Sequence, residues 1–151
     1  MPSAPVDDFD ADLASLVQDL VDTLHGTATG IGISAPQVGD LRRVLVMDLT
    51  NDRNGPEVYV NPEILSRSTP GLVEESCLSI PGVVGNVVRS TELRVRALDR
   101  HGAPFERALT GMHAVCLQHE LDHLDGKLFI DRLSLLRRIG FRLKRALGAA
   151  S

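Results

Sequence analysis

Two histidines spaced four residues apart, His119 and His123, constrain this chain more than any other feature of its sequence. Glu120 directly follows the first of them, which gives the pattern H-E-x-x-H. In an α-helix of about 3.6 residues per turn, positions i and i+4 lie on one face. If this stretch is helical, both imidazoles can bind one metal ion while Glu120 faces a water beside it. The fold then has to bring further ligands to this helix.

The sequence predicts that the helix runs from about Thr110 to Leu124 and is ended by Gly126, because glycine adopts the backbone angles that close helices. Apolar side chains on either side of the histidines predict that its flanks are buried, which places it in the centre of the fold. These flanking residues are Met112, Val115, Cys116, Leu117 and Leu121.

Short apolar stretches separated by turn residues precede this helix and predict consecutive strands. The pattern is clearest at residues 91–99, where apolar and polar positions alternate, and "DRHG" at residues 99–102 fits a hairpin turn. Further strands are predicted at residues 43–49, at 57–64 with an interruption at Pro62, at 83–89 and at 104–109. The expected fold is α+β, with mainly antiparallel sheets packed around the central helix in one domain of residues 1–151.

Two amphipathic helices are predicted near the ends of the chain. The first follows a loose start at residues 1–8 and stops at Gly26; its apolar stripe is Leu13, Leu16, Val17, Leu20, Val21 and Leu24. The second lies within residues 133–148 and has a stripe of Leu135, Leu136, Ile139, Leu143, Ala146 and Leu147. Its opposite face is basic, which fits either a solvated surface or a surface that docks on phosphate-rich RNA.

Composition narrows the class of protein. The chain has 151 residues, of which 43% are hydrophobic and 24% charged, as expected of one soluble domain. Its net charge of −4 argues against overall affinity for nucleic acid, although a local basic patch is compatible with it. Neither a signal-peptide pattern nor a membrane-spanning apolar run occurs, so we expect a cytoplasmic protein with no membrane contact and with reduced cysteines.

A catalytic metal site usually has three protein ligands, and the two histidines supply only two of them. Cys116 shares roughly the same helix face, but a buried cysteine in an apolar helix is usually part of the core. Asp125 and Asp131 follow the histidines, and Asp131 is the stronger of the two, because some metallopeptidases use an acidic third ligand. Cys77 is distant in sequence, but a thiolate binds zinc or iron strongly. Spacing alone leaves these alternatives open.

Three motifs occur in order along the chain: "GIGISAPQ" at residues 30–37, "ESCLS" at 75–79 and "QHELDH" at 118–123. Together they resemble the signature motifs of the peptide deformylase family, and the likeness extends over roughly Leu13 to Leu147. The resemblance implies that Cys77, His119 and His123 hold the metal. It also implies one ion per chain, with Fe²⁺ as the native metal and Zn²⁺, Ni²⁺ or Co²⁺ as substitutes.

The same resemblance implies an activity, namely removal of the formyl group from the N-terminal formyl-methionine of nascent polypeptides. Metal-bound hydroxide would attack the formyl carbon, with Glu120 as the general base and then the general acid. The resemblance assigns stabilisation of the developing oxyanion to the side-chain amide of Gln37 and the backbone N–H of Leu78. The expected partners are formyl-methionyl peptides, and the protein is expected to be a monomer.

Substrate binding is expected along the first motif. Gly30 and Gly32 would let the backbone lie close to an extended peptide that pairs with it through main-chain hydrogen bonds. An apolar pocket for the methionine side chain is expected from residues near the motifs, namely Ile31, Val73, Met112, Val115 and Cys116. Glu75 and Arg89 are either an ion pair that stiffens the segment around Cys77 or two unrelated surface charges.

The chain also departs from the family pattern. Ser34 stands where alanine is usual and Ser76 where glycine is common, and the segment before the first helix is short. The basic C-terminal helix resembles the tail that bacterial members use at the ribosome, so the ribosome is a further expected partner. Two alternatives remain: a metallopeptidase using His119, His123 and Asp131, and a non-catalytic metal-binding, ribosome-associated module. Gln37 and Glu120 argue against the module, because neither is needed merely to hold an ion.

Overall fold

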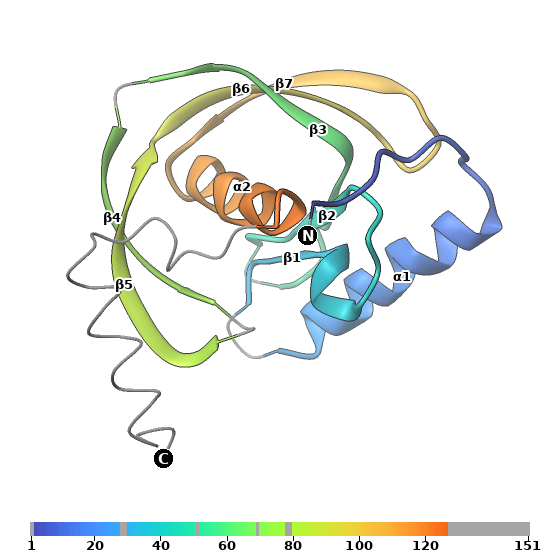
Figure 1. Cartoon of the computed structure of the whole chain (residues 1–151), viewed down its shortest axis with the longest axis horizontal. Helices are drawn as coiled ribbons and strands as arrows, with labels where there is room; N and C mark the ends of the chain where they lie inside the picture. The colour runs from blue at the N-terminus through green and yellow to red at the C-terminus, as the bar shows by residue number, and fades with distance from the viewer. Residues whose placement is uncertain (1, 28–29, 51, 69, 78–79, 127–151) are drawn as a thin grey trace.

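The computed structural model describes residues 2–27, 30–50, 52–68, 70–77 and 80–126, and within 73–77 and 80–87 it describes the backbone alone (Figure 1). The predicted basic helix of residues 133–148 therefore lies outside the described residues. None of the helices in the described ranges has the length and apolar character needed to cross a membrane.

The predicted α+β fold is confirmed. The chain forms α1 (Ala11–His25), β1 (Gly32–Ser34), the short 3₁₀ helix η1 (Ala35–Val38), β2 (Val44–Met47), β3 (Glu57–Arg67), β4 (Pro70–Cys77), β5 (Ile80–Ser90), β6 (Glu92–Leu98), β7 (Pro104–Thr110) and α2 (Gly111–Leu124). Strands β1-β2-β3-β6-β7 make one antiparallel sheet in that order, and β4 and β5 make a separate antiparallel hairpin. In Figure 1, α2 lies between the larger sheet and this hairpin, and α1 lies on the far side of β1 and β2.

Strand β2 separates the two halves of the core, and all four of its residues are buried. Successive side chains of a strand point to opposite faces. Val44 and Val46 accordingly pack in the cluster that contains α1, whereas Leu45 and Met47 pack in the cluster that contains α2. The continuous apolar run in residues 43–49, where a half-exposed strand would alternate, is therefore explained by helices on both faces.

Helix α1 confirms the predicted first helix. Asp10 is its N-cap and accepts a hydrogen bond from the Leu13 N–H at 3.0 Å, and Gly26 is its C-cap. The predicted stripe faces the core, with Leu13, Leu16, Val17, Leu20 and Leu24 buried and Val21 partly buried against them.

The β6–β7 hairpin also follows the prediction. Leu93, Val95 and Ala97 are buried, while the residues between them are exposed. The Asp99 carboxylate accepts hydrogen bonds from the backbone N–H groups of His101 and Ala103, and Gly102 has a φ of +87°. Together these interactions close the turn.

The prediction for Pro62 was wrong in part. Strand β3 continues through this residue to Arg67 and does not end there. Its pairing with β6 shifts register between Val60 and Glu63, and Asn61 has a φ of +51°. The proline is thus accommodated in a β-bulge, where a missing N–H donor does not break the ladder.

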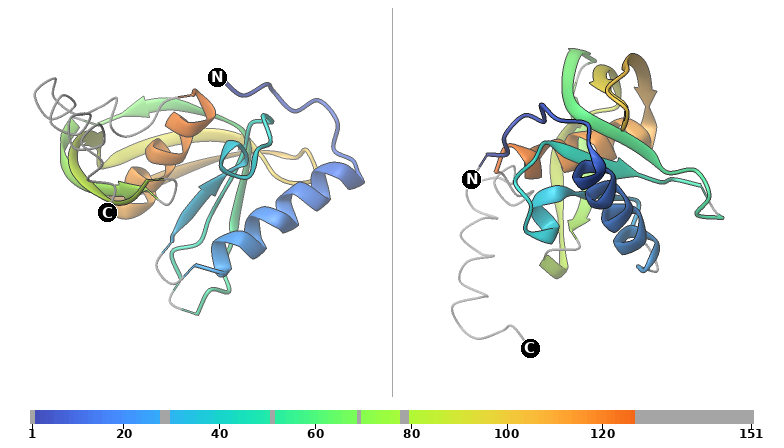
Figure 2. Two further views of the ribbon diagram at one scale, coloured as in Figure 1. Left: turned by 60° about the horizontal axis from the view of Figure 1, so that its bottom comes forward. Right: turned by 90° about the vertical axis from the view of Figure 1, so that its right-hand side faces the viewer.

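The predicted loose start is wrong for the described residues 2–8. The Ser3 N–H donates to the Leu124 carbonyl at 2.7 Å, and Ala4 pairs with Arg42 in an isolated bridge. Val6 is buried, and its backbone exchanges two hydrogen bonds with the Asn61 side chain, at 2.8 and 2.9 Å. Figure 2 shows this stretch crossing from the end of α2 to the start of α1.

A buried carboxylate ties α1 to the end of β2. Asp48 has a fully buried side chain, and one of its oxygens lies 2.8 Å from Nε2 of His25. Burial raises the pKa of Asp48, but hydrogen bonds from the Thr50 side chain, from His25 and from the backbone of Thr50 and Gly55 outweigh this and lower it to about 2.

We expect Asp48→Asn to lower the free energy of unfolding at neutral pH by about 2 kcal/mol, because the hydrogen bonds of the folded state stabilise the ionised carboxylate more than water does in the unfolded chain. The native pKa is depressed from 3.8, so this stabilisation is complete above pH 3.8 and is lost as the pH falls from there toward 2. Urea denaturation at a series of pH values measures the difference. The exposed Asp52 in the same loop provides the control variant Asp52→Asn, which should unfold like the wild type at neutral pH.

Candidate active site

Helix α2 matches the predicted bounds closely. It begins at Gly111 after Thr110, ends at Leu124, and is followed by Gly126 with a φ of +78°. Val115, Cys116 and Leu117 are buried and Leu121 is partly buried, as predicted. The prediction for Met112 was wrong, because 54% of this residue is exposed. It lies in the first turn of α2.

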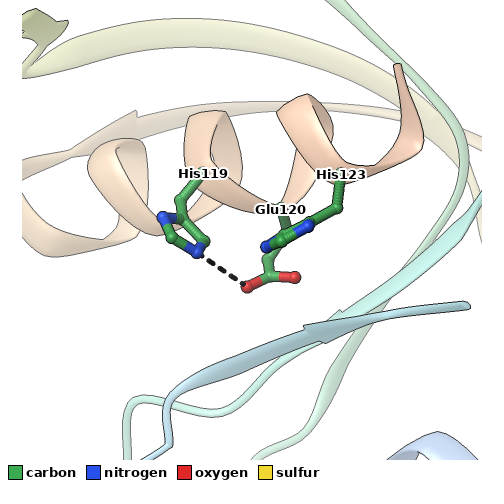
Figure 3. A group of neighbouring side chains, drawn as sticks. All are labelled: His119, Glu120 and His123. Atoms are coloured by element: carbon green, nitrogen blue, oxygen red, sulfur yellow. Dashed lines mark ion pairs between the residues drawn. The ribbon is translucent and has the colours of Figure 1, made fainter. Parts of the chain in front are cut away.

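The two histidines and the glutamate lie together on one side of α2 (Figure 3). The imidazole centroids of His119 and His123 are 5.1 Å apart, and Nε2 of His119 lies 3.9 Å from Oε1 of Glu120. All three side chains are largely buried: His119 is 11% and Glu120 4% exposed by side chain, and His123 is 6% exposed. Figure 3 shows the Glu120 carboxylate reaching away from the helix axis, next to both rings.

This group fits a divalent metal ion. One ligand atom from each of the three residues lies within 4.8 Å of the others. In a tetrahedral site two nitrogens each about 2.1 Å from one ion are about 3.4 Å apart, so binding an ion requires these side chains to move closer together. No other group of His, Cys, Asp and Glu in the described residues offers a comparable arrangement. Cys116 and Asp125, both considered as third ligands, are outside it.

Asp125 and Cys116 have other surroundings. Oδ1 of Asp125 lies 3.0 Å from Nη1 of Arg43, and Asp125 is the C-cap residue of α2. Cys116 is buried in the core cluster that contains α2.

Residues on a different face of α2 anchor it to β5. The Gln118 side chain accepts from the Ser90 N–H at 3.0 Å and donates to the Ser90 carbonyl at 2.6 Å. One turn further on, Asp122 lies 2.6 Å from Nη1 of Arg89, and both side chains are less than 10% exposed. Gln118 and Asp122 are four residues apart, so the sequence placed them on one face, but it did not indicate that β5 is their partner.

The expected link between Arg89 and the ESCLS segment involves a residue whose side chain is not described, Glu75. Arg89 is not a surface charge, since it is only 4% exposed. The structure adds Asp122 as a buried partner, so the ion pair ties the β4–β5 hairpin to the helix that carries the histidines.

We expect Asp122→Ala to lower the free energy of unfolding by about 2 to 3 kcal/mol, because it removes a buried, charge-assisted hydrogen bond to the Arg89 guanidinium. Glu63→Ala is the matched control. It removes a carboxylate from the exposed pair with Arg96, in which both side chains are more than half exposed, and should cost less than about 1 kcal/mol. Equal losses in the two variants, measured by urea denaturation, would contradict the prediction.

Gln37 lies in η1, directly after β1. Its side-chain oxygen accepts from the Ser34 N–H at 2.9 Å and from the Ser34 hydroxyl at 3.1 Å. These contacts orient the amide, because the oxygen faces Ser34 and the NH₂ group must point the other way. The hydroxyl of Ser34 thus contributes one of the two bonds that orient Gln37, and an alanine at this position would lack it.

Arg53 forms hydrogen bonds to the backbone just before β1. Its guanidinium donates to the carbonyl of Gly30 and, at 3.1 Å, to that of Thr27. The Asp48 N–H donates to the Ile31 carbonyl at 2.8 Å. Nothing in the sequence pattern singled out Arg53, which lies in a turn with a φ of +59°.

Several predicted site residues are not described at side-chain level. Strand β4 ends at Cys77, and its last two residues pair with Val84 and Ile80 of β5. The side chains of Val73 and Cys77, and all of Leu78 and Asp131, lie outside the described atoms. Their assignments remain predictions.

An H-E-x-x-H helix, with its carboxylate beside two paired imidazoles, places the chain among the metal-dependent hydrolases. A family profile described as "Polypeptide deformylase" matches residues 1–138. The chain is 49% identical over 143 residues to a peptide deformylase of Alkalilimnicola ehrlichii, covering 94% of this chain and 80% of the relative. The chain belongs to the peptide deformylase family.

Solved structures agree with this assignment. A peptide deformylase from Legionella pneumophila superposes with a TM-score of 0.89 at 44% identity, covering 100% of this chain and 91% of that one. A peptide deformylase from Synechococcus elongatus in complex with actinonin has a TM-score of 0.87 at 35% identity, covering 99% and 81%. The resemblance in the three motifs is therefore confirmed at the level of the whole fold.

Proposed function

We propose that this enzyme removes the formyl group from formyl-methionyl peptides, using a divalent ion held by His119, His123 and Cys77 and Glu120 as the proton carrier. The observation that carries the proposal is the position of Glu120. Its carboxylate lies beside both imidazoles and only 3.9 Å from His119 Nε2, in a largely buried site. Holding an ion alone would not require a buried carboxylate at this point.

The proposed metal ligands are two neutral imidazoles and one thiolate. When bound, a divalent ion polarises the formyl carbonyl and lowers the pKa of a water molecule toward neutrality. A donor set of two nitrogens and one sulfur suits Fe²⁺, which we propose as the native metal, and it also accepts Zn²⁺, Ni²⁺ or Co²⁺.

Glu120 takes the proton from the attacking water and passes it to the departing amine. This role needs a carboxylate within reach of the reacting atoms and shielded from bulk water, and Glu120 is buried next to both histidines. One proton leaves the water and one proton is gained by the amine nitrogen, so one side chain that first accepts and then donates it is sufficient. The formic acid that results then loses its remaining proton to water and becomes formate.

Gln37 is proposed to donate to the oxygen that gains negative charge during attack. The two hydrogen bonds from Ser34 engage its carbonyl oxygen, and the amide NH₂ is the part of this side chain that can donate to a developing oxyanion. The backbone N–H of Leu78 is proposed as the second donor. Donors fixed before the reaction stabilise such charge more than donors that must reorganise.

The substrate peptide is proposed to add to β1. In the described part of the larger sheet, β1 is an edge strand with β2 as its neighbour. Pairing with this edge would use main-chain groups of residues 30–33 and tolerate varied side chains. Ile31, Val115 and Cys116, together with Val73, are proposed to contact the methionine side chain. Met112 is proposed there as well, and its 54% exposure leaves it accessible to a ligand.

The decisive experiment measures formate released from a formyl-Met peptide by anaerobically purified, Fe²⁺-loaded protein. The same peptide carrying an acetyl group in place of formyl is the control, and it should be cleaved far more slowly. Formate without cleavage of internal peptide bonds is the expected result. Internal cleavage would favour the metallopeptidase, and no reaction at full metal occupancy would favour a non-catalytic metal-binding module.

We also propose that the enzyme acts as a cytoplasmic monomer at the ribosome. The basic side chains of residues 137–145 support this proposal through their affinity for RNA phosphates. Cosedimentation with ribosomes at increasing salt tests it. Replacing Arg137, Arg138, Lys144 and Arg145 by glutamine should abolish binding at low salt and leave formate release from free peptides intact.

A further inference from the structure

Gly32 is the first residue of β1 and faces α2 at the site. A Cβ atom added to it would lie 2.6 Å from Sγ of Cys116, 3.0 Å from Cγ of Glu120 and 3.3 Å from Oε1 of Glu120. Real Cβ atoms do not approach other heavy atoms as closely as the first of these distances, and the second is at the limit of contact. The space that a side chain would take at residue 32 is thus filled by Cys116 and Glu120.

Backbone conformation does not explain this glycine. Gly32 lies in a regular strand, paired with Met47, and is absent from the glycines with positive φ among the described residues. An alanine could adopt its backbone angles without strain. Only the close approach of α2 requires glycine here.

We propose that Gly32 is a positioning residue: its missing side chain provides the slot in which the Glu120 carboxylate is held beside the two imidazoles. Cys116 fills the remainder of the slot, one helical turn before Glu120. The side chain of Glu120 is 4% exposed, so a Cβ at residue 32 leaves it no nearby space and either rotates the carboxylate away or pushes α2 from β1. This inference rests on the proposed role of Glu120.

The first test is kinetic and uses the metal-loaded, full-length protein. Gly32→Ala alone is expected to disturb packing, because its Cβ meets Sγ of Cys116. The comparison is therefore between the double variant Gly32→Ala/Cys116→Ala and the single variant Cys116→Ala. Neither variant has Sγ of Cys116, so the added Cβ of the double variant meets Glu120 alone. We expect kcat to be at least about 10-fold lower in the double variant, with KM changed less than about twofold and metal content equal.

A KM increase with unchanged kcat would overturn the proposal, because it would show that residue 32 acts through substrate contact. Equal kcat and KM in the two variants would also overturn it. Gly71→Ala is the matched glycine control: Gly71 lies in β4, has no heavy atom within 4 Å of an added Cβ and has no positive φ. It should match the wild type in both constants.

The second test needs no catalysis, so it separates failure of this inference from failure of the proposed function. Overpacking at residue 32 should lower the unfolding midpoint of the zinc-loaded protein by about 3 to 10 °C. In the Cys116→Ala/Glu120→Ala background the same substitution should lower it by less than half as much. A penalty that does not depend on Cys116 and Glu120 would show that they do not share the slot. Lack of formate release by the wild type would instead overturn the proposed function.

Discussion

Glu120→Gln should reduce kcat for formate release by a factor of about 10² to 10⁴ while the protein keeps its metal. This is the range that a positioned general base contributes. Glutamine has nearly the same shape, so it fits the slot opposite Gly32 but cannot take a proton. The two histidines are unchanged, and metal content measured by elemental analysis should therefore equal that of the wild type.

The control for this variant is Glu106→Gln. Glu106 lies on β7, is 46% exposed by side chain and is 3.6 Å from Arg94. It should behave as the wild type in rate and metal content. If Glu120→Gln kept more than a tenth of the wild-type kcat, the base would have to be another group and the proposed mechanism would be wrong.

Cys77→Ala should remove both the bound metal and the activity. The backbone places Cys77 at the end of β4, in the hairpin that Arg89 and Gln118 connect to α2. Loss of a residue that merely orients a ligand costs about 10- to 100-fold in metal affinity, so loss of a ligand should cost at least 100-fold. Competition with a chromophoric chelator measures the affinity for Zn²⁺.

Cys116→Ala is the matched comparison, because it removes the other thiol of the chain. It should retain metal at full stoichiometry, since Cys116 is not part of the described His119, Glu120 and His123 group. If Cys77→Ala retained metal and Asp131→Ala lost it, the acidic third ligand would be correct. The ligand set of the metallopeptidase alternative would then apply to this chain.

The hydrophobic period of the sequence predicted burial correctly where the burial of a side chain depends only on its position in its own helix or strand. The bounds of α2, the alternation in β6 and the stripe of α1 were predictable because helical and strand periods alone decide which side chains are buried. The exposure of Met112 shows the limit of this reasoning. The helical period gave its face, but burial also depends on how far along the helix the neighbouring sheets extend.

Features that depend on a distant partner could not be predicted. Gln118 and Asp122 were on a common face, but only the folded structure shows that β5 passes there. The N-terminal stretch is held by backbone hydrogen bonds and one buried valine. Such contacts leave no periodic hydrophobic pattern in the sequence, so they could not be predicted from it. Gly32 looked like a glycine for substrate access, and its contact with Cys116 and Glu120 depends on the distance between β1 and α2.

The hydrogen bond from Ser3 to Leu124 joins the first described residues to the turn that carries His123. The carbonyl of Leu124 also accepts from Arg43 Nη1 at 3.3 Å, so this helix end is satisfied by two segments far upstream. A fusion tag or deletion that displaces Ser3 frees one of these bonds and lets the last turn fray. A fusion placed directly before Ser3 is therefore expected to loosen the turn that carries His123, although it touches neither histidine.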